Sequence, residues 1–256
     1  MRLKDQAAII TGGGRGIGRA IALAYGSEGA RLVLTSRTAT EVEAVATEVR
    51  NAGGTAFAVP GDVSASKDAE RVVATALREF GRIDVLVNNA GIPGPDKPLV
   101  DISESEWDEV MAVNIKGIFL YAKAVLPLML PQRRGNIINI SSGAGEKRPR
   151  LGLRSLPYAV SKFAVEGFTH ALAIQLKGTG VNVNALKPGP TRTRFQDSWS
   201  PEEFRRHAAE IGEMHEPSFV NQLAVHLASL SPGELTGESI SAREWNQRHP
   251  GASLGL

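Results

Sequence analysis

Short apolar runs alternate with amphipathic segments along most of this chain. Six of the runs have the length and composition of buried parallel strands, and they span 7–11, 31–35, 56–59, 83–87, 136–140 and 181–186. Segments with apolar residues at helical spacing lie between them, over about 17–27, 40–51, 64–80 and 103–130 and around Tyr158. This alternation predicts an α/β fold in which a parallel, doubly wound sheet has right-handed crossovers and helices on both faces.

In such a sheet the ligand crevice lies at the carboxyl ends of the strands. A turn that reads TGGGRGIG (11–18) follows the first predicted strand and leads into a helix. Its glycines allow close approach of a pyrophosphate, and the helix N-terminus offers amide groups and partial positive charge. The spacing of Gly12, Gly16 and Gly18 differs from the commoner G-x-G-x-x-G. A tight strand–helix connection is the alternative, but the flanking elements favour a dinucleotide site.

The end of the second strand indicates which dinucleotide is bound. An NAD site usually places an acidic residue there to bind the ribose 2′-hydroxyl. This chain has Ser36 and Arg37 instead, and Arg15 lies in the glycine-rich turn. Arginine pairs well with a 2′-phosphate, and one such contact gives roughly tenfold to a hundredfold preference. NADP(H) is therefore expected in preference to NAD(H), although Arg15 also fits a solvated loop.

Polar and small residues end the third and fourth strands. Asp62, followed by Val63, suits either an acceptor for the adenine amino group or a cap for the helix that begins near Ser64, and both interpretations stay open. The motif NNAG (88–91) permits close approach of a cofactor, although its asparagines also suit a turn. These positions fall at the same predicted edge as the glycine-rich turn.

A long helix begins at Ser103, which forms a capping box with Glu106. Asn114 lies inside this helix, although asparagine is a poor helix former. Its neighbours are apolar, so a buried functional residue is favoured over a solvent-facing one.

The pair with the most specific chemistry is Tyr158 and Lys162. They are four residues apart, so a helix places them one turn apart on one face. A fixed ammonium favours the phenolate, and a pKa lowered by about two corresponds to about 2.7 kcal/mol. Such a tyrosine exchanges protons with an alcohol or carbonyl near neutral pH. Taken alone, the pattern is short and common and favours an ordinary polar pair on a solvated helix, so the rest of the chain decides between the two interpretations.

Composition narrows the class of protein. The 256 residues are 42% hydrophobic and 22% charged, with a formal net charge of +2, so no general nucleic-acid or membrane partner is indicated. The chain has no cysteine, and its five histidines do not pair at metal-ligand spacing. The apolar run at 117–130 is broken by Lys123 and Pro127, so no membrane span is expected. The apolar run near the N-terminus is too short for a signal peptide. We expect one cytoplasmic domain over 1–256, without a metal.

These motifs, in this order, resemble those of the short-chain dehydrogenase/reductase family, in its single-domain branch and near the 3-oxoacyl reductases. The resemblance covers about 2–240 and rests on 11–18, 62–63, 88–91, Asn114, SS (141–142), YAVSK (158–162) and PGPTRT (188–193). It implies a Rossmann-type sheet of about seven strands in the order 3-2-1-4-5-6-7, with the last strand at 238–241. It also implies a homo-oligomer, either a dimer or a tetramer.

The family's mechanism maps onto four residues: Asn114, Ser142, Tyr158 and Lys162. The resemblance implies that Tyr158 is the general acid for carbonyl reduction and the base for alcohol oxidation. Lys162 would hold the nicotinamide ribose and lower the tyrosine pKa. Ser142 would hydrogen-bond the substrate oxygen, and Asn114 would help to hold a water that links Lys162 to solvent. Hydride would pass between the nicotinamide and a small-molecule carbonyl or secondary alcohol.

The implied cofactor-binding residues are Gly12, Arg15, Gly16, Ile17, Gly18, Ser36, Arg37, Asp62, Val63, Asn89, Ala90, Gly91, Tyr158, Lys162, Pro188, Gly189 and Thr193. Thr193 matches the family's contact to the nicotinamide carboxamide. A nucleotide-binding sensor or scaffold without turnover is the alternative function, and a subunit that works only beside a partner is a third.

Two departures from the family pattern bear on the substrate and the assembly. Ser142 stands 16 residues before Tyr158, farther than is usual, so 146–157 is expected to be a longer loop. Its basic residues suit either an anionic substrate, such as a carboxylate, coenzyme A thioester or acyl carrier, or a solvated loop; they are Lys147, Arg148, Arg150 and Arg154. The segment 191–216 is the expected substrate lid, with aromatic residues Phe195, Trp199 and Phe204. The tail at 243–256 is atypical, which leaves the oligomeric form open.

Overall fold

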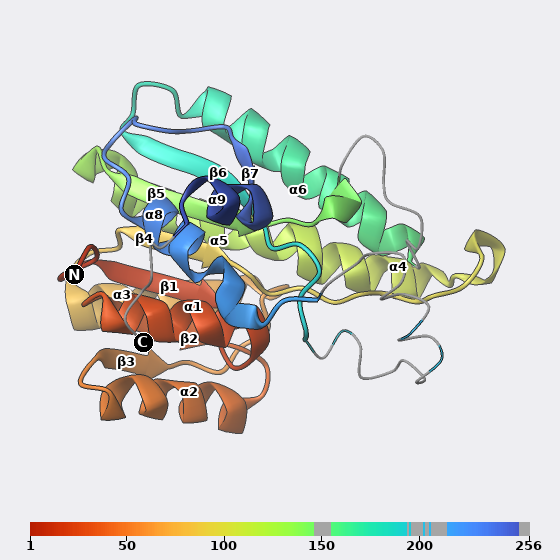
Figure 1. Ribbon diagram of the computed structural model, residues 1–256, viewed down its shortest axis with the longest axis horizontal. Helices are drawn as coiled ribbons and strands as arrows, with labels where there is room; N and C mark the ends of the chain where they lie inside the picture. Colours follow the sequence, from red (N-terminus) through yellow and green to blue (C-terminus); the bar gives the residue numbers. More distant parts are fainter. Residues whose placement is uncertain (146–154, 194, 196–201, 203–204, 206–213, 251–256) are drawn as a thin grey trace.

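The computed structural model describes residues 1–145, 155–193, 195, 202, 205 and 214–250. Seven strands of the described chain form one parallel sheet in the order β3-β2-β1-β4-β5-β6-β7 (Figure 1). They are β1 (Ala7–Thr11), β2 (Arg31–Thr35), β3 (Thr55–Ala58), β4 (Val85–Asn88), β5 (Gly135–Ile140), β6 (Val181–Lys187) and β7 (Ser239–Ser241). The predicted fold class and strand order are confirmed.

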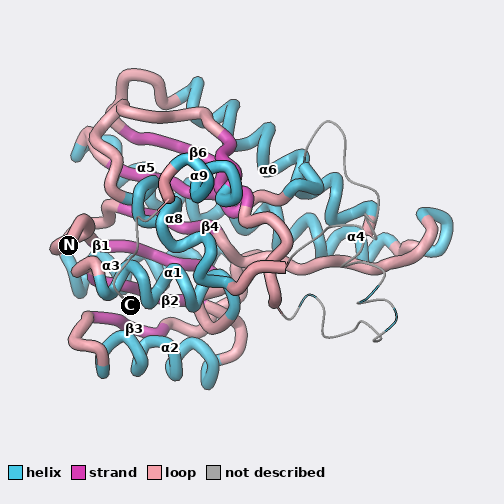
Figure 2. The backbone as a smooth tube through the Cα atoms, in the orientation of Figure 1, coloured by secondary structure: helices cyan, strands magenta, loops and turns pink. Residues whose placement is uncertain are grey.

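Helices cover both faces of the sheet, as Figure 2 shows. One core cluster joins the sheet to α1 (Gly16–Ser27), α2 (Ala39–Asn51), α8 (Asn221–Ala228) and α9 (Ala242–Arg248). The other joins it to α3 (Ser66–Phe80), α5 (Gly117–Gln132) and α6 (Leu156–Gln175). Neighbouring strand residues serve opposite faces, since Ile9 belongs to the second cluster and Ile10 to the first. Both faces are therefore buried, which explains the nearly continuous apolar strands.

The long helix predicted from 103 to 130 forms with one irregularity. It consists of α4 (Glu104–Met111), a π-helical segment η2 (Ala112–Lys116) and α5. The capping box is present, because Ser103 Oγ accepts from the main-chain N–H of Glu106 and the Glu106 carboxylate accepts from the N–H of Ser103. Asn114 lies in the π-helical segment, and such segments are frequent at functional sites.

The run from Glu104 to Gln132 is also long and apolar enough to cross a membrane, by length and composition alone. In the fold, α5 packs against α3, β4 and β5. Its buried face includes Tyr121, Val125 and Met129. These contacts identify it as a core helix of the sheet.

The strand register brings the predicted site segments to one edge. Thr11 pairs with Thr35 at the ends of β1 and β2, and Ile140 pairs with Leu186 near the ends of β5 and β6. The glycine-rich turn, Ser36 and Ser141 therefore leave the sheet on the same side. Short 3₁₀ helices lie in the connections, at η1 (Leu99–Asp101), η3 (Gly143–Gly145) and η5 (Pro217–Val220).

Candidate active site

The glycine-rich turn depends on the absence of side chains. Gly12 and Gly16 have φ values of 63° and 52°, a region that disfavours other residues. A Cβ on Gly18 would lie 2.2 Å from the carbonyl oxygen of Gly12 and 2.6 Å from Asn89 Nδ2. The first turn of α1 can therefore pack directly against the strand end only because position 18 is glycine.

The N-terminus of α1 is suited to an anion. Its N-cap residue, Arg15, is extended, and no side chain of the described residues caps the first turn. Ile17 packs on the core and fixes the start of the helix. Arg15 Nη1 lies 3.4 Å from Glu41 Oε1. The glycine-rich turn leaves space that side chains would fill, and it lies next to the main-chain N–H groups at the start of α1. This arrangement fits a dinucleotide pyrophosphate.

Thr11 organises the turn, although sequence analysis did not single it out. Its hydroxyl oxygen accepts hydrogen bonds from the main-chain N–H groups of Asn89 (3.0 Å) and Ala90 (3.1 Å). The Asn89 amide in turn donates to the carbonyl oxygens of Thr11 (2.9 Å) and Gly12 (3.1 Å). These bonds join the ends of β1 and β4. A buried threonine at the end of an apolar strand was the available signal.

The expected 2′-phosphate site lies at the end of β2. Arg37 is exposed, and its Nη1 lies 3.9 Å from Glu109 Oε1 on α4. A Cβ on Gly14 would lie only 2.9 Å from Ser36 Oγ. The glycine at position 14 therefore leaves space for the Ser36 hydroxyl. Both predicted arginines therefore have a carboxylate neighbour, since Arg15 lies beside Glu41. Neither acidic partner was predicted from the sequence, because each lies on a separate helix.

Asp62 uses one carboxylate oxygen locally. Its Oδ1 accepts from the main-chain N–H (2.8 Å) and the hydroxyl (2.7 Å) of Ser64, ahead of α3. The helix itself begins at Ser66, so Asp62 stabilises the preceding turn rather than the N-cap position. Val63 is buried and would lie 3.1 Å from a Cβ on Gly117, which keeps this turn close to α5.

The proposed acid–base group lies at the start of α6. Ser155 caps this helix, and its Oγ accepts from the main-chain N–H of Tyr158. The hydroxyl of Tyr158 shares a hydrogen bond with that of Ser142. Lys162 Nζ donates to the carbonyl oxygen of Ile140 at 2.8 Å and lies 5.5 Å from the centroid of the tyrosine ring. The structure thus brings together three of the four residues that the resemblance implies are catalytic.

Burial shifts the pKa values of both titratable residues in this group. It raises the pKa of Tyr158, and the hydrogen bond with Ser142 lowers it only in part. The net pKa of Tyr158 is thus raised, which differs from the lowered pKa that the resemblance implies. Burial also lowers the pKa of Lys162 to about 8, while the negative charge of Glu166 acts in the opposite direction. Both side chains therefore favour their neutral forms more than they would in water.

Asn114 is buried and joins three segments. Its Oδ1 accepts from the main-chain N–H of Ile92 at 2.8 Å, and its Nδ2 donates to the Ile92 carbonyl at 3.0 Å. The same Nδ2 donates to Ser161 Oγ at 2.9 Å, which ties it to α6. A Cβ on Gly91 would lie 3.3 Å from Asn114 Oδ1, so the NNAG segment also packs here. Asn114 is therefore a fixed part of the site's framework.

The segment after β6 returns to the glycine-rich turn. Gly189, after Pro188, has a φ of 78°. A Cβ on Gly16 would lie 3.5 Å from Thr193 Cγ2, so Thr193 reaches the start of α1. The ring of Phe195 meets that of Tyr158 edge-on, with centroids 5.9 Å apart. This aromatic contact places the start of the expected lid beside the tyrosine.

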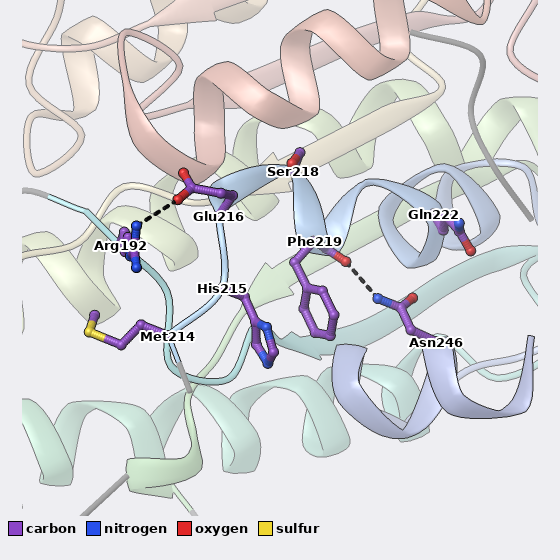
Figure 3. A pocket seen from close by; sticks show the side chains of 8 residues that line it. All are labelled: Arg192, Met214, His215, Glu216, Ser218, Phe219, Gln222 and Asn246. Atoms are coloured by element: carbon purple, nitrogen blue, oxygen red, sulfur yellow. Dashed lines mark hydrogen bonds and ion pairs between the residues drawn. The ribbon is translucent and has the colours of Figure 1, made fainter. Parts of the chain in front are cut away.

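The two ends of the expected lid are tied together. Thr191 and His215 form a parallel bridge, with hydrogen bonds of 2.9 Å from Arg192 N to His215 O and from His215 N to Pro190 O. Arg192 also pairs with Glu216 at 3.2 Å. Figure 3 shows this pair at a cavity of about 460 Å³, which does not include Tyr158. The cavity is lined by Arg192, Met214, His215, Glu216, Ser218, Phe219, Gln222 and Asn246.

Several sequence predictions fall outside the described residues. They concern the basic residues Lys147, Arg148, Arg150 and Arg154, most of the lid with Trp199 and Phe204, and the tail beyond 250. Within the described chain, no group of three or more His, Asp or Glu side chains is arranged to hold a metal ion.

A family model described as short chain dehydrogenase matches residues 6–203, more than half of the chain. The chain belongs to the short-chain dehydrogenase family. It is an NAD(P)-dependent oxidoreductase that acts on a carbonyl or alcohol.

Curated relatives and solved structures agree with this assignment. Short-chain reductase protein NovJ of Streptomyces niveus is 37% identical over 246 residues, covering 93% of this chain and 92% of that protein. 3-oxoacyl-[acyl-carrier-protein] reductase FabG of Thermotoga maritima is 34% identical over 247 residues, covering 94% and 97%. The crystal structure of levodione reductase superposes with a TM-score of 0.86 at 29% identity, covering 93% of this chain and 96% of that one.

Proposed function

We propose that this dehydrogenase is an NADP(H)-dependent carbonyl reductase in which Tyr158 is the general acid and base. The observation that carries the proposal is the contact of Tyr158 with Ser142, beside the Lys162 ammonium that Ile140 holds. A general acid must be within hydrogen-bond reach of the oxygen it protonates, and Ser142 marks a place where such an oxygen would meet two hydroxyl groups.

In the reducing direction, Tyr158 donates its phenolic proton to the substrate oxygen while Ser142 hydrogen-bonds that oxygen. A bound nicotinamide supplies the hydride to the carbonyl carbon, and accepts it in the reverse direction. The raised pKa of Tyr158 keeps the proton donor loaded at neutral pH. The nearby Lys162 ammonium then stabilises the phenolate that proton transfer leaves. Lys162 would also hold the nicotinamide ribose, and Asn114 a water toward solvent.

NADP(H) preference is part of the proposal. It is supported by Arg37 and Ser36 at the end of β2, where an NAD enzyme usually has a carboxylate, and by Arg15 in the glycine-rich turn. Asp62 would accept from the adenine amino group with the carboxylate oxygen that Ser64 does not use. Asn89, Ala90 and Gly91 line the same edge of the sheet.

For the substrate, we propose a ketone on an anionic or thioester-linked carrier. Two relatives bear the name 3-oxoacyl-[acyl-carrier-protein] reductase; one, from Synechocystis, is 39% identical over 201 residues. The basic residues at 147–154 provide positive charge near the active-site serine in sequence. Replacing Lys147, Arg148 and Arg150 with Ser should then weaken anionic substrates and leave neutral ketones unaffected. Equal losses for both would make this segment structural.

We further propose a cytoplasmic homo-oligomer. The outer faces of α5 and α6 carry exposed large apolar side chains, which suit a contact between copies. They are Phe119, Leu130, Leu156, Val160, Phe163 and Ile174. Phe163→Glu should shift the gel-filtration peak toward the monomer, whereas an unchanged peak would rule out this face.

The test of the enzyme proposal is NADPH oxidation over a panel of carbonyl compounds, with Tyr158→Phe as the control. The panel holds 3-oxoacyl thioesters, quinones, cyclic ketones, diketones and aldehydes. Tyr158→Phe should lose about 100-fold or more of the turnover. It should still bind NADPH in a fluorescence titration. Turnover that survives in the variant would refute the role of Tyr158, and NADPH binding without turnover on any compound would favour a sensor.

A further inference from the structure

Three consecutive residues at the end of β5 bind three side chains on α6. The helical residues are four apart, so they form one column along the face of α6 that meets the strand end. The contacts of Lys162 and Tyr158 belong to the proposed acid–base group, whereas the contact of Glu166 does not. The pairs are Ile140 with Lys162, Ser141 with Glu166, and Ser142 with Tyr158.

The contact between Ser141 and Glu166 has no place in the proposed mechanism. Ser141 is buried, and its hydroxyl donates a short hydrogen bond to Glu166 Oε1. Glu166 is half-buried and lies one helical turn beyond Lys162. A carboxylate in such a position interacts more strongly with a neighbouring charge than it would in open solvent.

The packing around this contact is tight. A Cβ on Gly145 would lie 2.6 Å from the carbonyl oxygen of Lys162 and 3.3 Å from Glu166 Cγ. The 3₁₀ turn η3 therefore rests directly on the helical turn between these two residues. Both ends of the segment from Ser141 to Gly145 therefore contact α6.

The charged groups around Lys162 also indicate a role for Glu166. Burial disfavours its ammonium form, and Glu166 is the group that opposes this effect. Tyr158 lies beside it on α6, and Lys187 ends β6, the strand next to β5. His170, one turn beyond Glu166, lies toward Gly237. Among these groups, Glu166 is the only carboxylic acid.

We propose that Glu166 is a positioning residue that keeps Lys162 in its ammonium form and holds the strand end that carries Ser142. The proposal rests on the proposed function, because it assigns Glu166 to the same acid–base group. Glu166 acts through Lys162 and Ser141. Its charge and its hydrogen bond have separate consequences, which two variants separate.

Glu166→Gln keeps a hydrogen-bond acceptor for Ser141 but removes the charge. Its rate of NADPH-dependent reduction should fall off with rising pH about one pH unit earlier than that of the wild type, because Lys162 loses its proton more easily. Ser141→Ala is the matched control, since it removes the hydrogen bond and keeps the charge. It should lower kcat without changing the pH at which the rate begins to fall. Glu166→Asp, which restores the charge, should return that pH toward its wild-type value.

A second measurement does not depend on activity. The side-chain amine of Lys162 can be titrated by NMR in full-length protein labelled with ¹⁵N-lysine, with Lys162→Arg to assign its signal. Glu166→Gln should lower the midpoint of this titration. An unchanged midpoint in a folded variant, confirmed by its melting curve, would overturn the inference. A wild-type protein that reduces no carbonyl while the midpoint still shifts would instead refute the proposed function alone.

Discussion

Lys162 Nζ donates a 2.8 Å hydrogen bond to the carbonyl oxygen of Ile140, the last residue of β5. The bond fixes a buried ammonium between the sheet and α6, beside Tyr158. A main-chain carbonyl satisfies one N–H of the ammonium but supplies no negative charge. The lysine is thereby well placed and only weakly stabilised in its charged form, which makes the site sensitive to pH.

Lys162 should make the stability of the protein depend on pH in a specific window. Its pKa is about 8 in the fold and 10.5 in the unfolded chain, so between these values the unfolded chain binds more protons. Stability contributed by this residue should therefore rise with pH through the window. The difference corresponds to roughly 3 kcal/mol. Denaturant unfolding of the wild type and Lys162→Met gives the difference between their free energies of unfolding, which should change between pH 7 and pH 10.5. The same difference at both pH values would contradict the lowered pKa of Lys162.

Arg37 and Glu109 should set the cofactor preference in opposite directions. Arg37→Ser removes a contact to the 2′-phosphate and should reduce the preference for NADPH over NADH by about tenfold or more. Glu109→Gln frees Arg37 from a competing carboxylate and should raise NADPH affinity by up to about fivefold, the range of exposed ion pairs.

Asp108→Asn, on the same helix, is the matched control for this pair because it makes the same change of charge. Fluorescence titrations with both cofactors measure the effect. Equal NADPH and NADH affinities in the wild type would refute the Arg37 assignment, and equal gains in Glu109→Gln and Asp108→Asn would reduce Glu109 to a general charge effect.

Gly18→Ala should abolish cofactor binding or folding. The new Cβ would lie 2.2 Å from the Gly12 carbonyl oxygen, so either the turn or α1 must move. Gly167→Ala is the control, since apart from its own helix backbone no described part of the chain lies within 4 Å of its Cβ position on α6. That change should stabilise the helix by about 0.5–1 kcal/mol. Melting curves with and without NADPH compare the two variants, and a Gly18→Ala protein with normal NADPH binding would refute the close packing.

Asn114→Leu should destabilise the protein by about 2–4 kcal/mol, because it leaves both main-chain groups of Ile92 without their partner. Ser161→Ala removes only the hydroxyl that Asn114 Nδ2 also contacts, so its effect should be smaller. Denaturant unfolding gives both values. Equal losses would show that the contact to α6, rather than the Ile92 segment, carries the stability.

Trp245 should anchor the C-terminal helix α9. Its ring stacks between His226 of α8, at 4.3 Å, and His249, at 3.9 Å. Trp245→Ala should cost about 2 kcal/mol, less than a fully buried aromatic residue, because the ring is only half-buried. Arg243→Ala, an exposed change on the same helix, should have little effect. Unfolding curves measure both, and unchanged stability in Trp245→Ala would show that α9 is held by other contacts.

Local patterns alone predicted the elements that carry the site. The boundaries of β1 and β2 agree with the apolar runs at 7–11 and 31–35, because strands buried on both faces leave continuous apolar sequence. The glycine-rich turn could also be predicted from the sequence, since only glycine fits such close backbone contacts. The helix α9 was missed, although Ser241 and Glu244 form the cap that its start required.

The sequence by itself determined six of the strands and the helices between them, and their alternation and order brought the glycine-rich turn, Ser142 and Pro188 to one edge of the sheet. Only the tertiary structure decided the partners of the charged and polar side chains. Arg37 meets Glu109, Asn114 meets Ile92, and Ser141 meets Glu166. Helical and strand periodicity depends on neighbours a few residues apart, whereas these contacts join separate segments and arise only when the sheet and its helices pack together.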